Sequence, residues 1–267
     1  MNRSPRLIAT DLDGTIIHDD GSVSPRTMVA LRRAMDAGIR VVFVTGRPPR
    51  WMGAVADETG HAGIGICANG AYVYDMTTEQ VLETYAMSAA TAAEAVRRVR
   101  EVLPQAAFGM ESLAGFAHDE NYHPRWDPDP LLGIGAIEDF LTDEIAKVLV
   151  RADGTPGDDM LRAVTPALDS VVEVTHSNVN DSLLELSAPG VNKATTLAIL
   201  AERWGIDRAD VVAFGDMPND VELLRWAGLG YAVGDAHPLA LEAADEHAPS
   251  IADDGVAQVI ERLLDAS

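Results

Sequence analysis

The stretch Leu7-Ile8-Ala9-Thr10-Asp11-Leu12-Asp13-Gly14-Thr15 decides the fold. A short apolar run that ends abruptly in two carboxylates and a glycine is typical of a buried strand with charged residues at its carboxyl end. In open α/β sheets, ligands bind at that edge. Two acidic side chains separated by one residue can hold Mg²⁺ and leave a carboxylate oxygen free to act as a nucleophile. Gly14 permits a turn conformation that a β-carbon would resist.

The composition limits the partners of the protein. The 267 residues carry a formal net charge of −22, which repels nucleic acid and anionic membrane surfaces. An anionic substrate therefore needs a bound cation or a local cluster of positive groups. Lys147 and Lys193 are the only lysines among the 20 basic residues, so each is expected to have a specific reason not to be arginine.

The sequence indicates a cytoplasmic protein. Cys67 is the single cysteine, so no internal disulfide is expected and a reducing compartment fits best. The N-terminal residues enter a strand almost at once, and no apolar stretch is long enough to span a bilayer. We therefore expect no membrane partner and no nucleic acid partner, and the oligomeric state is left open.

The first part of the chain alternates strands and helices, which predicts a doubly wound α/β fold around a parallel sheet. The 40–44 strand ends in Thr45-Gly46-Arg47 and the 63–68 strand ends in Asn69-Gly70. The expected elements are strands at 7–10, 40–44 and 63–68, with a helix from Ser24-Pro25 to Gly38 and another from Pro48 to Gly60.

A different rhythm over residues 87–188 predicts an inserted α+β domain, which divides the core into 1–86 and 189–267. A hairpin over 72–85 is expected to lead away from the core sheet, toward the inserted domain. The insertion is expected to contain helices at 89–103 and 156–164, strands around Phe108 and Phe116 and at 146–150, 171–174 and 183–186, and an irregular stretch over 119–135.

Parallel α/β alternation returns after the insertion. The 211–214 strand ends in Gly215-Asp216-Met217-Pro218-Asn219-Asp220. Because the carboxyl ends of parallel strands meet at one edge, we expect these polar residues to lie near Asp11. The other expected elements are helices at 193–205 and 221–227, a strand at 230–233 and two final helices.

Five motifs together resemble those of the haloacid dehalogenase superfamily, and within it the Cof-type phosphatases with a large α/β cap of the C2 type. The resemblance covers the whole chain. In chain order, the motifs are Asp11-Leu12-Asp13-Gly14-Thr15, Thr45-Gly46-Arg47, Asn69-Gly70, Lys193 and Gly215-Asp216-Met217-Pro218-Asn219-Asp220.

The resemblance implies roles for the acidic residues. Asp11 would attack phosphorus and become a transient aspartyl phosphate, while Asp13 would protonate the leaving oxygen and then deprotonate water. The implied cofactor is Mg²⁺, held by Asp11, the backbone carbonyl of Asp13 and Asp216. The residues that would hold these ligands in place without contacting the ion are Asp220, Thr15 and Asn69.

The resemblance also implies a phosphate cradle. Thr45 and Gly46, with the backbone amides of the Thr45-Gly46-Arg47 turn, would bind phosphate oxygens, and Lys193 would bridge the nucleophile and the phosphate. Asn219 would complete the cradle. Arg47 itself is expected to be structural or to lie at the cap interface.

The implied function is Mg²⁺-dependent hydrolysis of small phosphorylated metabolites, with sugar phosphates first and flavin or pyridoxal phosphates next. A sugar phosphomutase of the same superfamily is the alternative enzyme, and it would yield an isomerised ester instead of free phosphate. A catalytically idle binding or regulatory module is the alternative from another class. Such a module would normally lack one of Asp11, Asp13, Lys193 or Asp216, and all four are present.

Individual residues also have simpler interpretations. Asp11 and Asp13 could form a solvated turn or a metal-binding pair of the glycosyltransferase kind. Thr45 could be a helix cap and Asn69 a left-handed turn residue, while the acidic residues over 216–220 could complement a helix dipole.

Overall fold

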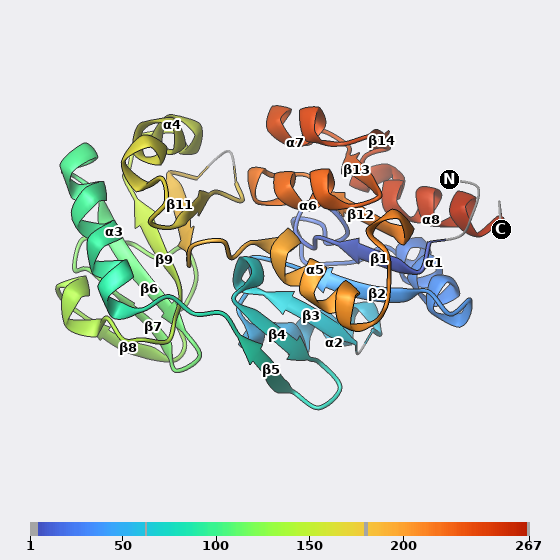
Figure 1. The fold of residues 1–267 in the computed structure, drawn as a ribbon, viewed down its shortest axis with the longest axis horizontal. Helices are drawn as coiled ribbons and strands as arrows, with labels where there is room; N and C mark the ends of the chain where they lie inside the picture. The colour runs from blue at the N-terminus through green and yellow to red at the C-terminus, as the bar shows by residue number, and fades with distance from the viewer. Residues whose placement is uncertain (1–4, 62, 179–180, 266–267) are drawn as a thin grey trace. The chain divides into compact units, whose positions relative to one another are not determined.

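The computed structural model describes residues 5–61, 63–178 and 181–265 and divides the chain into two compact units (Figure 1). The core unit comprises Met1–Glu83 and Lys193–Ser267, and the cap unit comprises Thr84–Asn192. The boundaries expected from the sequence, 86/87 and 188/189, differ from these by three and four residues.

An eight-stranded sheet in the order β14-β13-β12-β1-β2-β3-β4-β5 forms the centre of the core unit. Neighbouring strands run parallel from β14 to β3, and β4 pairs antiparallel with β3, so the expected α/β class is confirmed. The strands are β1 (Leu7–Thr10), β2 (Arg40–Val44), β3 (Ile64–Cys67), β4 (Tyr72–Asp75), β5 (Gln80–Thr84), β12 (Val211–Gly215), β13 (Leu229–Val233) and β14 (Glu246–Ala248).

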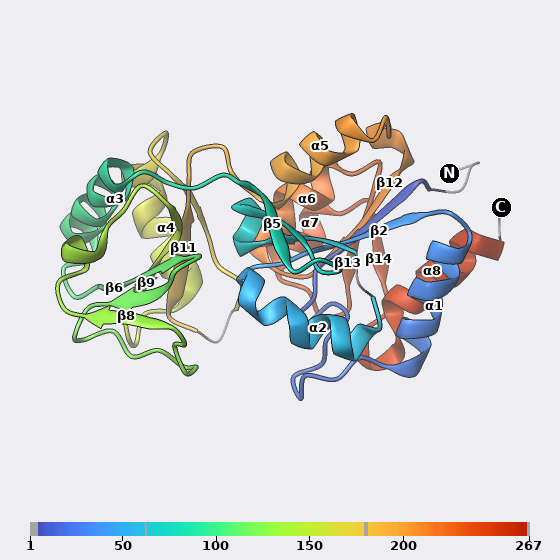
Figure 2. The same cartoon turned by 90° about the horizontal axis from the view of Figure 1, so that it is seen from below.

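Helices cover both faces of this sheet, with α1, α2 and α8 on one face and α5 and α6 on the other (Figure 2). The start of α1 follows the sequence signal, since the Ser24 side chain accepts a hydrogen bond from the Thr27 amide. The helices are α1 (Pro25–Asp36), α2 (Met52–Thr59), α5 (Lys193–Arg203), α6 (Val221–Trp226), α7 (Pro238–Ala243) and α8 (Gly255–Asp265).

The hairpin of β4 and β5 extends the core sheet, so the expectation that it leads away from the sheet is wrong. After β3 the chain reverses in a short turn over Ala68–Gly70, in which Ala68 and Asn69 have φ values of 50° and 56°. This reversal brings β4 back beside β3, where Tyr72 and Val73 are buried. The apolar surface of Tyr72 and Val73 is thus removed from water, which favours this position of β4.

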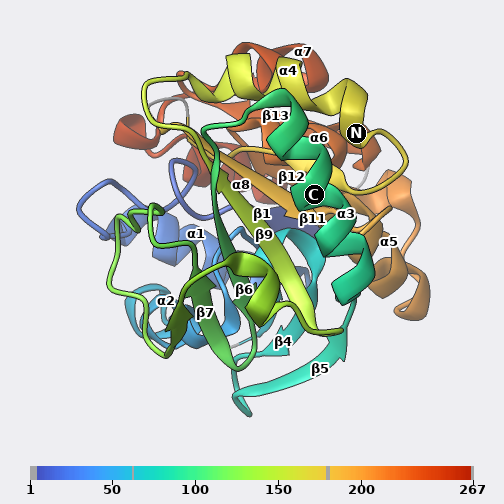
Figure 3. The same cartoon turned by 90° about the vertical axis from the view of Figure 1, so that its left-hand side faces the viewer.

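The cap unit is a six-stranded sheet in the order β10-β11-β9-β6-β7-β8, with two helices packed on one face (Figure 3). Phe108, Val148 and Leu186 lie in the apolar cluster under those helices. The elements are α3 (Ala89–Val102), β6 (Ala107–Ser112), β7 (Gly115–His118), β8 (Leu131–Ile134), β9 (Ile145–Arg151), α4 (Gly157–Leu168), β10 (Glu173–Thr175) and β11 (Leu183–Ser187).

The opposite face of the cap sheet carries buried ion pairs. Side chains alternate along β9, so Lys147 and Arg151 point away from the helices that cover Val148. Nζ of Lys147 lies 3.2 Å from Oε1 of Glu185. Nη1 of Arg151 lies 2.6 Å from Oδ1 of Asp181. Lys147 is therefore part of the internal structure of the cap unit.

Two short strands, β8 and β14, were not expected from the sequence. The strand β8 lies within the stretch that was expected to be irregular, and its side chains are largely exposed. The strand β14 has only three residues, Glu246–Ala248. Neither segment has the apolar alternation that identifies a strand, and each is specified by pairing with a neighbour, β7 or β13.

Within 5–61, 63–178 and 181–265, every helix is too short or too polar to cross a membrane.

Candidate active site

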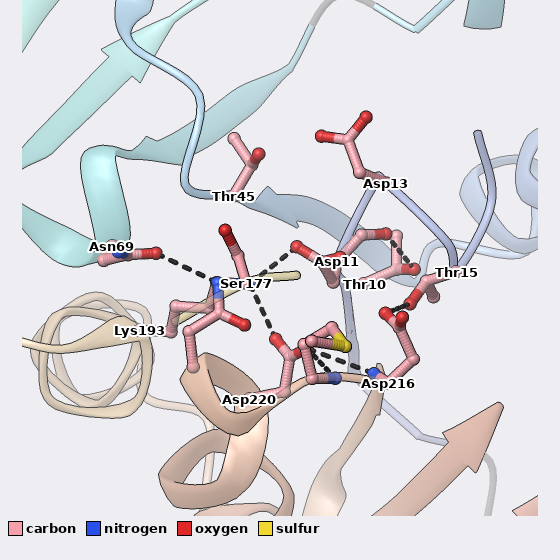
Figure 4. Close-up of polar contacts among 12 residues, drawn as sticks. Thr10, Asp11, Asp13, Thr15, Thr45, Asn69, Ser177, Lys193, Asp216 and Asp220 are labelled. Atoms are coloured by element: carbon pink, nitrogen blue, oxygen red, sulfur yellow. Dashed lines mark hydrogen bonds and ion pairs between the residues drawn. The ribbon is translucent and has the colours of Figure 1, made fainter. Parts of the chain in front are cut away.

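Four adjacent strands of the core sheet, β12, β1, β2 and β3, bring polar side chains to one edge (Figure 4). Asp11 follows β1 and Thr45 follows β2, and their amides still donate to the neighbouring strands, at Phe214 and Ile66. Asp216 follows β12, and its amide donates to the Asp220 side chain instead. The parallel sheet therefore brings together motifs that lie far apart in the sequence.

Lys193 is the first residue of α5 and connects two carboxylates (Figure 4). Its Nζ lies 2.6 Å from Oδ1 of Asp11 and 2.6 Å from Oδ1 of Asp220, and the side chain is completely buried. Burial opposes the charge, but the two carboxylates outweigh it and hold the pKa of Lys193 above its ordinary value. The group is therefore an ammonium fixed between two acids.

Asp11 lies in a strongly anionic environment. Burial raises its pKa well above the ordinary value, and although Lys193 lowers it, the nearby Asp220 and Asp216 raise it further. One ammonium does not balance three carboxylates in a buried site. Such a cluster favours a bound cation.

The β12 loop is held by Asp220. Its Oδ2 accepts hydrogen bonds from the amides of Asp216 and Met217, at 3.1 Å each, and its Oδ1 accepts from Lys193. The hydroxyl of Thr15 donates to Oδ1 of Asp216 at 2.7 Å. Burial, with a further contribution from Asp220, raises the pKa of Asp216 to about 7.

The donor set fits a magnesium ion. Asp11, Asp216 and Asp220 each offer a carboxylate oxygen, and these oxygens lie within 4.8 Å of one another. Mg²⁺ prefers such hard oxygen ligands and usually keeps several waters. Because both oxygens of Asp220 already accept hydrogen bonds, we propose Asp11 and Asp216 as the carboxylate ligands, with the backbone carbonyl of Asp13 as a third.

We predict that Gly14→Ala weakens Mg²⁺ binding. Gly14 has a φ of 81°, and an added β-carbon would lie 2.5 Å from Oδ2 of Asp216, so this carboxylate has to move. Disturbing a ligand's support costs roughly 10- to 100-fold in metal affinity. The measurement is the Mg²⁺ concentration that gives half-maximal turnover.

The matched control is Gly21→Ala. Gly21 has a similar φ of 85°, but nothing lies within 4 Å of its added β-carbon. Both variants carry the same backbone strain, on the order of 1 kcal/mol or more. An equal change of Mg²⁺ dependence in the two variants would contradict the assignment of Asp216.

Two backbone amides of the turn after β2 donate within the fold. The Thr45 amide donates to Ile66 at 2.8 Å, and the Arg47 amide donates to Oγ1 of Thr45 at 3.0 Å. The amides of Thr45 and Arg47 therefore serve the fold and are not offered for phosphate binding. The groups that we still propose for phosphate binding here are the hydroxyl of Thr45 and Gly46.

Asn219 and Asn69 contact each other across the site. Nδ2 of Asn219 lies 3.2 Å from Oδ1 of Asn69, and both side chains are buried. Asn69 also has a left-handed backbone, with a φ of 56°. Asn69 therefore both forms the left-handed turn and contacts the Asn219 side chain. Phosphate binding by Asn219 stays a prediction.

Asp13 lies apart from the Lys193 cluster. Its carboxylate is directed away from Asp11 (Figure 4), and 57% of its side chain is exposed. Nε of Arg47 lies 2.8 Å from Oδ2 of Asp13, and Nη2 lies 2.5 Å from Oδ1. Sequence reasoning kept Arg47 out of the site, although its position directly after Gly46, at the tip of the strand beside β1, was an available signal.

Comparisons with known proteins find relatives that match this chain along nearly its whole length. The family model of haloacid dehalogenase-like hydrolases matches residues 8–260. The chain is 26% identical over 279 residues to 5-amino-6-(5-phospho-D-ribitylamino)uracil phosphatase YitU of Bacillus subtilis (strain 168), covering 99% of both chains. It is 29% identical over 261 residues to phosphoglycolate phosphatase of Methanothermobacter thermautotrophicus, covering 97% of this chain and 99% of the relative.

The fold is shared as well. The structure of a haloacid dehalogenase-like hydrolase from B. subtilis superposes with a TM-score of 0.82 at 22% identity, covering 97% of this chain and 99% of that chain. The protein therefore belongs to the haloacid dehalogenase-like hydrolases, among the Cof-type phosphatases that carry an inserted cap.

Proposed function

We propose that this protein is a Mg²⁺-dependent phosphatase that hydrolyses monoesters of small phosphorylated metabolites through a phosphoryl group carried on Asp11. The observation that supports this most directly is the buried Lys193 ammonium, 2.6 Å from Oδ1 of both Asp11 and Asp220. It fixes the Asp11 carboxylate and supplies positive charge in an otherwise acidic protein.

We propose the following reaction for these groups. With Oδ1 of Asp11 held by Lys193, the Asp11 carboxylate would attack phosphorus and the ester P–O bond would break. The leaving oxygen takes a proton from Asp13. Asp13 then accepts a proton from the water that hydrolyses the acyl phosphate, which releases phosphate and restores Asp11.

The remaining polar groups would bind the phosphoryl oxygens. Lys193, the hydroxyl of Thr45, Gly46 and Asn219 are the donors that we propose for this task. When bound, Mg²⁺ would reduce the repulsion between Asp11 and a phosphate dianion and neutralise charge on the transferring group.

The substrate class is a small phosphorylated metabolite. Two relatives at 26% and 29% identity are named for different substrates, a phosphorylated ribitylaminouracil and phosphoglycolate. Similarity to these proteins therefore supports the class of small phosphorylated metabolites and not a single compound. We propose sugar phosphates first, then flavin and pyridoxal phosphates.

The test is a panel of phosphate monoesters incubated with the purified protein and Mg²⁺. A phosphatase releases inorganic phosphate from at least one ester, whereas a phosphomutase returns an isomerised ester. Absence of Mg²⁺-dependent turnover across the panel would support an idle binding module and would refute the proposal.

Removal of divalent cations is predicted to reduce turnover to background, with full recovery when Mg²⁺ is added back. The Mg²⁺ concentration for half-maximal turnover should rise as the pH falls below about 7. The reason is that the pKa of Asp216 is raised to about 7, so protons compete with the ion for this carboxylate. Turnover that persists in excess chelator would contradict the prediction.

A further inference from the structure

Arg47 holds Asp13 by a two-point contact. Nε and Nη2 of the guanidinium lie 2.8 Å and 2.5 Å from the two carboxylate oxygens. A planar fork that meets both oxygens fixes the orientation of the carboxylate as well as its position. The direction in which Asp13 faces is thus defined by Arg47.

The backbone on each side of this contact is anchored separately. The Arg47 carbonyl accepts from the Ala68 amide at 2.8 Å, which connects Arg47 to the turn after β3. On the other side, the amide of Gly14, next to Asp13, donates to the Ile17 carbonyl at 3.1 Å. The fold therefore brings the two side chains together from two fixed loops.

Stability alone is a weak reason for this arrangement. The Asp13 side chain is 57% exposed, so water and salt screen even a two-point contact and reduce its contribution to folding. The residue that the contact orients is, in contrast, the one assigned the proton transfers of the reaction.

We propose that Arg47 is the positioning residue of Asp13, which it holds in the orientation needed to protonate the leaving oxygen. The proposal rests on the phosphatase function proposed above. Because both oxygens of Asp13 meet the guanidinium, the plane of the carboxylate is fixed relative to Arg47.

The experiment compares kcat for two substrates of the wild-type enzyme, p-nitrophenyl phosphate and an alkyl phosphate from the panel. The nitrophenolate ion leaves without a proton, whereas an alkoxide needs one. Arg47→Ala should lower kcat for the alkyl phosphate by about 10²-fold but for the aryl phosphate by less than about fivefold, with little change in KM. Arg47→Lys should restore part of the loss, because an ammonium can make one of the two contacts.

A second comparison asks whether Arg47 acts through Asp13. In the background of Asp13→Ala, adding Arg47→Ala should cause no further loss of kcat for the alkyl phosphate. Full additivity of the two substitutions, with equal losses for both substrates and a raised KM, would show that Arg47 binds phosphate directly and would overturn the proposal.

The control variant is Arg26→Ala. Arg26 makes a similar two-point contact with Glu261, at 3.1 Å and 2.6 Å, in the same core unit. Its loss should leave kcat for both substrates at the wild-type value. A wild-type enzyme that turns over neither substrate refutes the proposed function itself, whereas equal losses in an active enzyme refute only the role of Arg47.

Discussion

Asp11→Asn should abolish phosphate release, lowering kcat by more than about 10⁴-fold, as expected when a catalytic nucleophile is removed. The amide has nearly the same size as the carboxylate, but its oxygen is too weak a nucleophile to form the acyl phosphate. Inorganic phosphate released from the best substrate of the panel is the quantity to measure, under saturating Mg²⁺.

The fold should survive this substitution. Burial and the neighbouring carboxylates raise the pKa of Asp11, so the ionised side chain is unfavourable in the metal-free protein, and a neutral amide relieves that cost. The Tm without Mg²⁺ should therefore equal or exceed that of the wild type. Asp19→Asn, an exposed change eight positions along the same loop region, is the matched control and should keep full turnover.

Lys193→Met is predicted to have the second large effect, on both stability and activity. The ammonium is completely buried between Asp11 and Asp220, so its removal leaves two buried carboxylates without their cation. Breaking a buried pair in this way costs about 3–5 kcal/mol. Turnover should also fall by on the order of 10³-fold, because the charge that offsets the phosphate and holds Asp11 is lost.

Lys147→Met separates these two effects. Lys147 is also a buried ammonium, paired with Glu185 in the cap unit, so its loss should lower the Tm in a similar way. It should leave kcat for p-nitrophenyl phosphate near the wild-type value. If both variants lost activity in proportion to their loss in Tm, Lys193 would have only a structural role.

Local sequence determined most of the fold. The strand at 40–44 and the start of the first helix at Pro25 were predicted to the residue, because continuous β-branched runs and a Ser-Pro start are strong local signals. The cluster at the strand tips was also predictable, since parallel strands bring their carboxyl ends to one edge. Asp11, Thr45, Asp216 and Lys193 all lie in the core unit at that edge.

Pairings between distant segments were decided by the tertiary structure. The edge strands β5, β8 and β14 depend on a neighbouring strand, because a short strand is stabilised by hydrogen bonds to that neighbour and not by its own pattern. The direction of the β4–β5 hairpin likewise depends on the left-handed turn at Asn69.

At the opening motif, the sequence by itself determined that Asp11 and Asp13 lie at the end of a buried strand and that Gly14 turns the chain there. The resemblance already implied that Lys193 meets Asp11, but only the tertiary structure decided the atoms in contact and paired Arg47 with Asp13. The physical reason is that backbone conformation follows from neighbours along the chain. The charge state and orientation of a carboxylate instead follow from groups a few ångströms away in space, supplied here by residues 34 and 182 positions further along the chain.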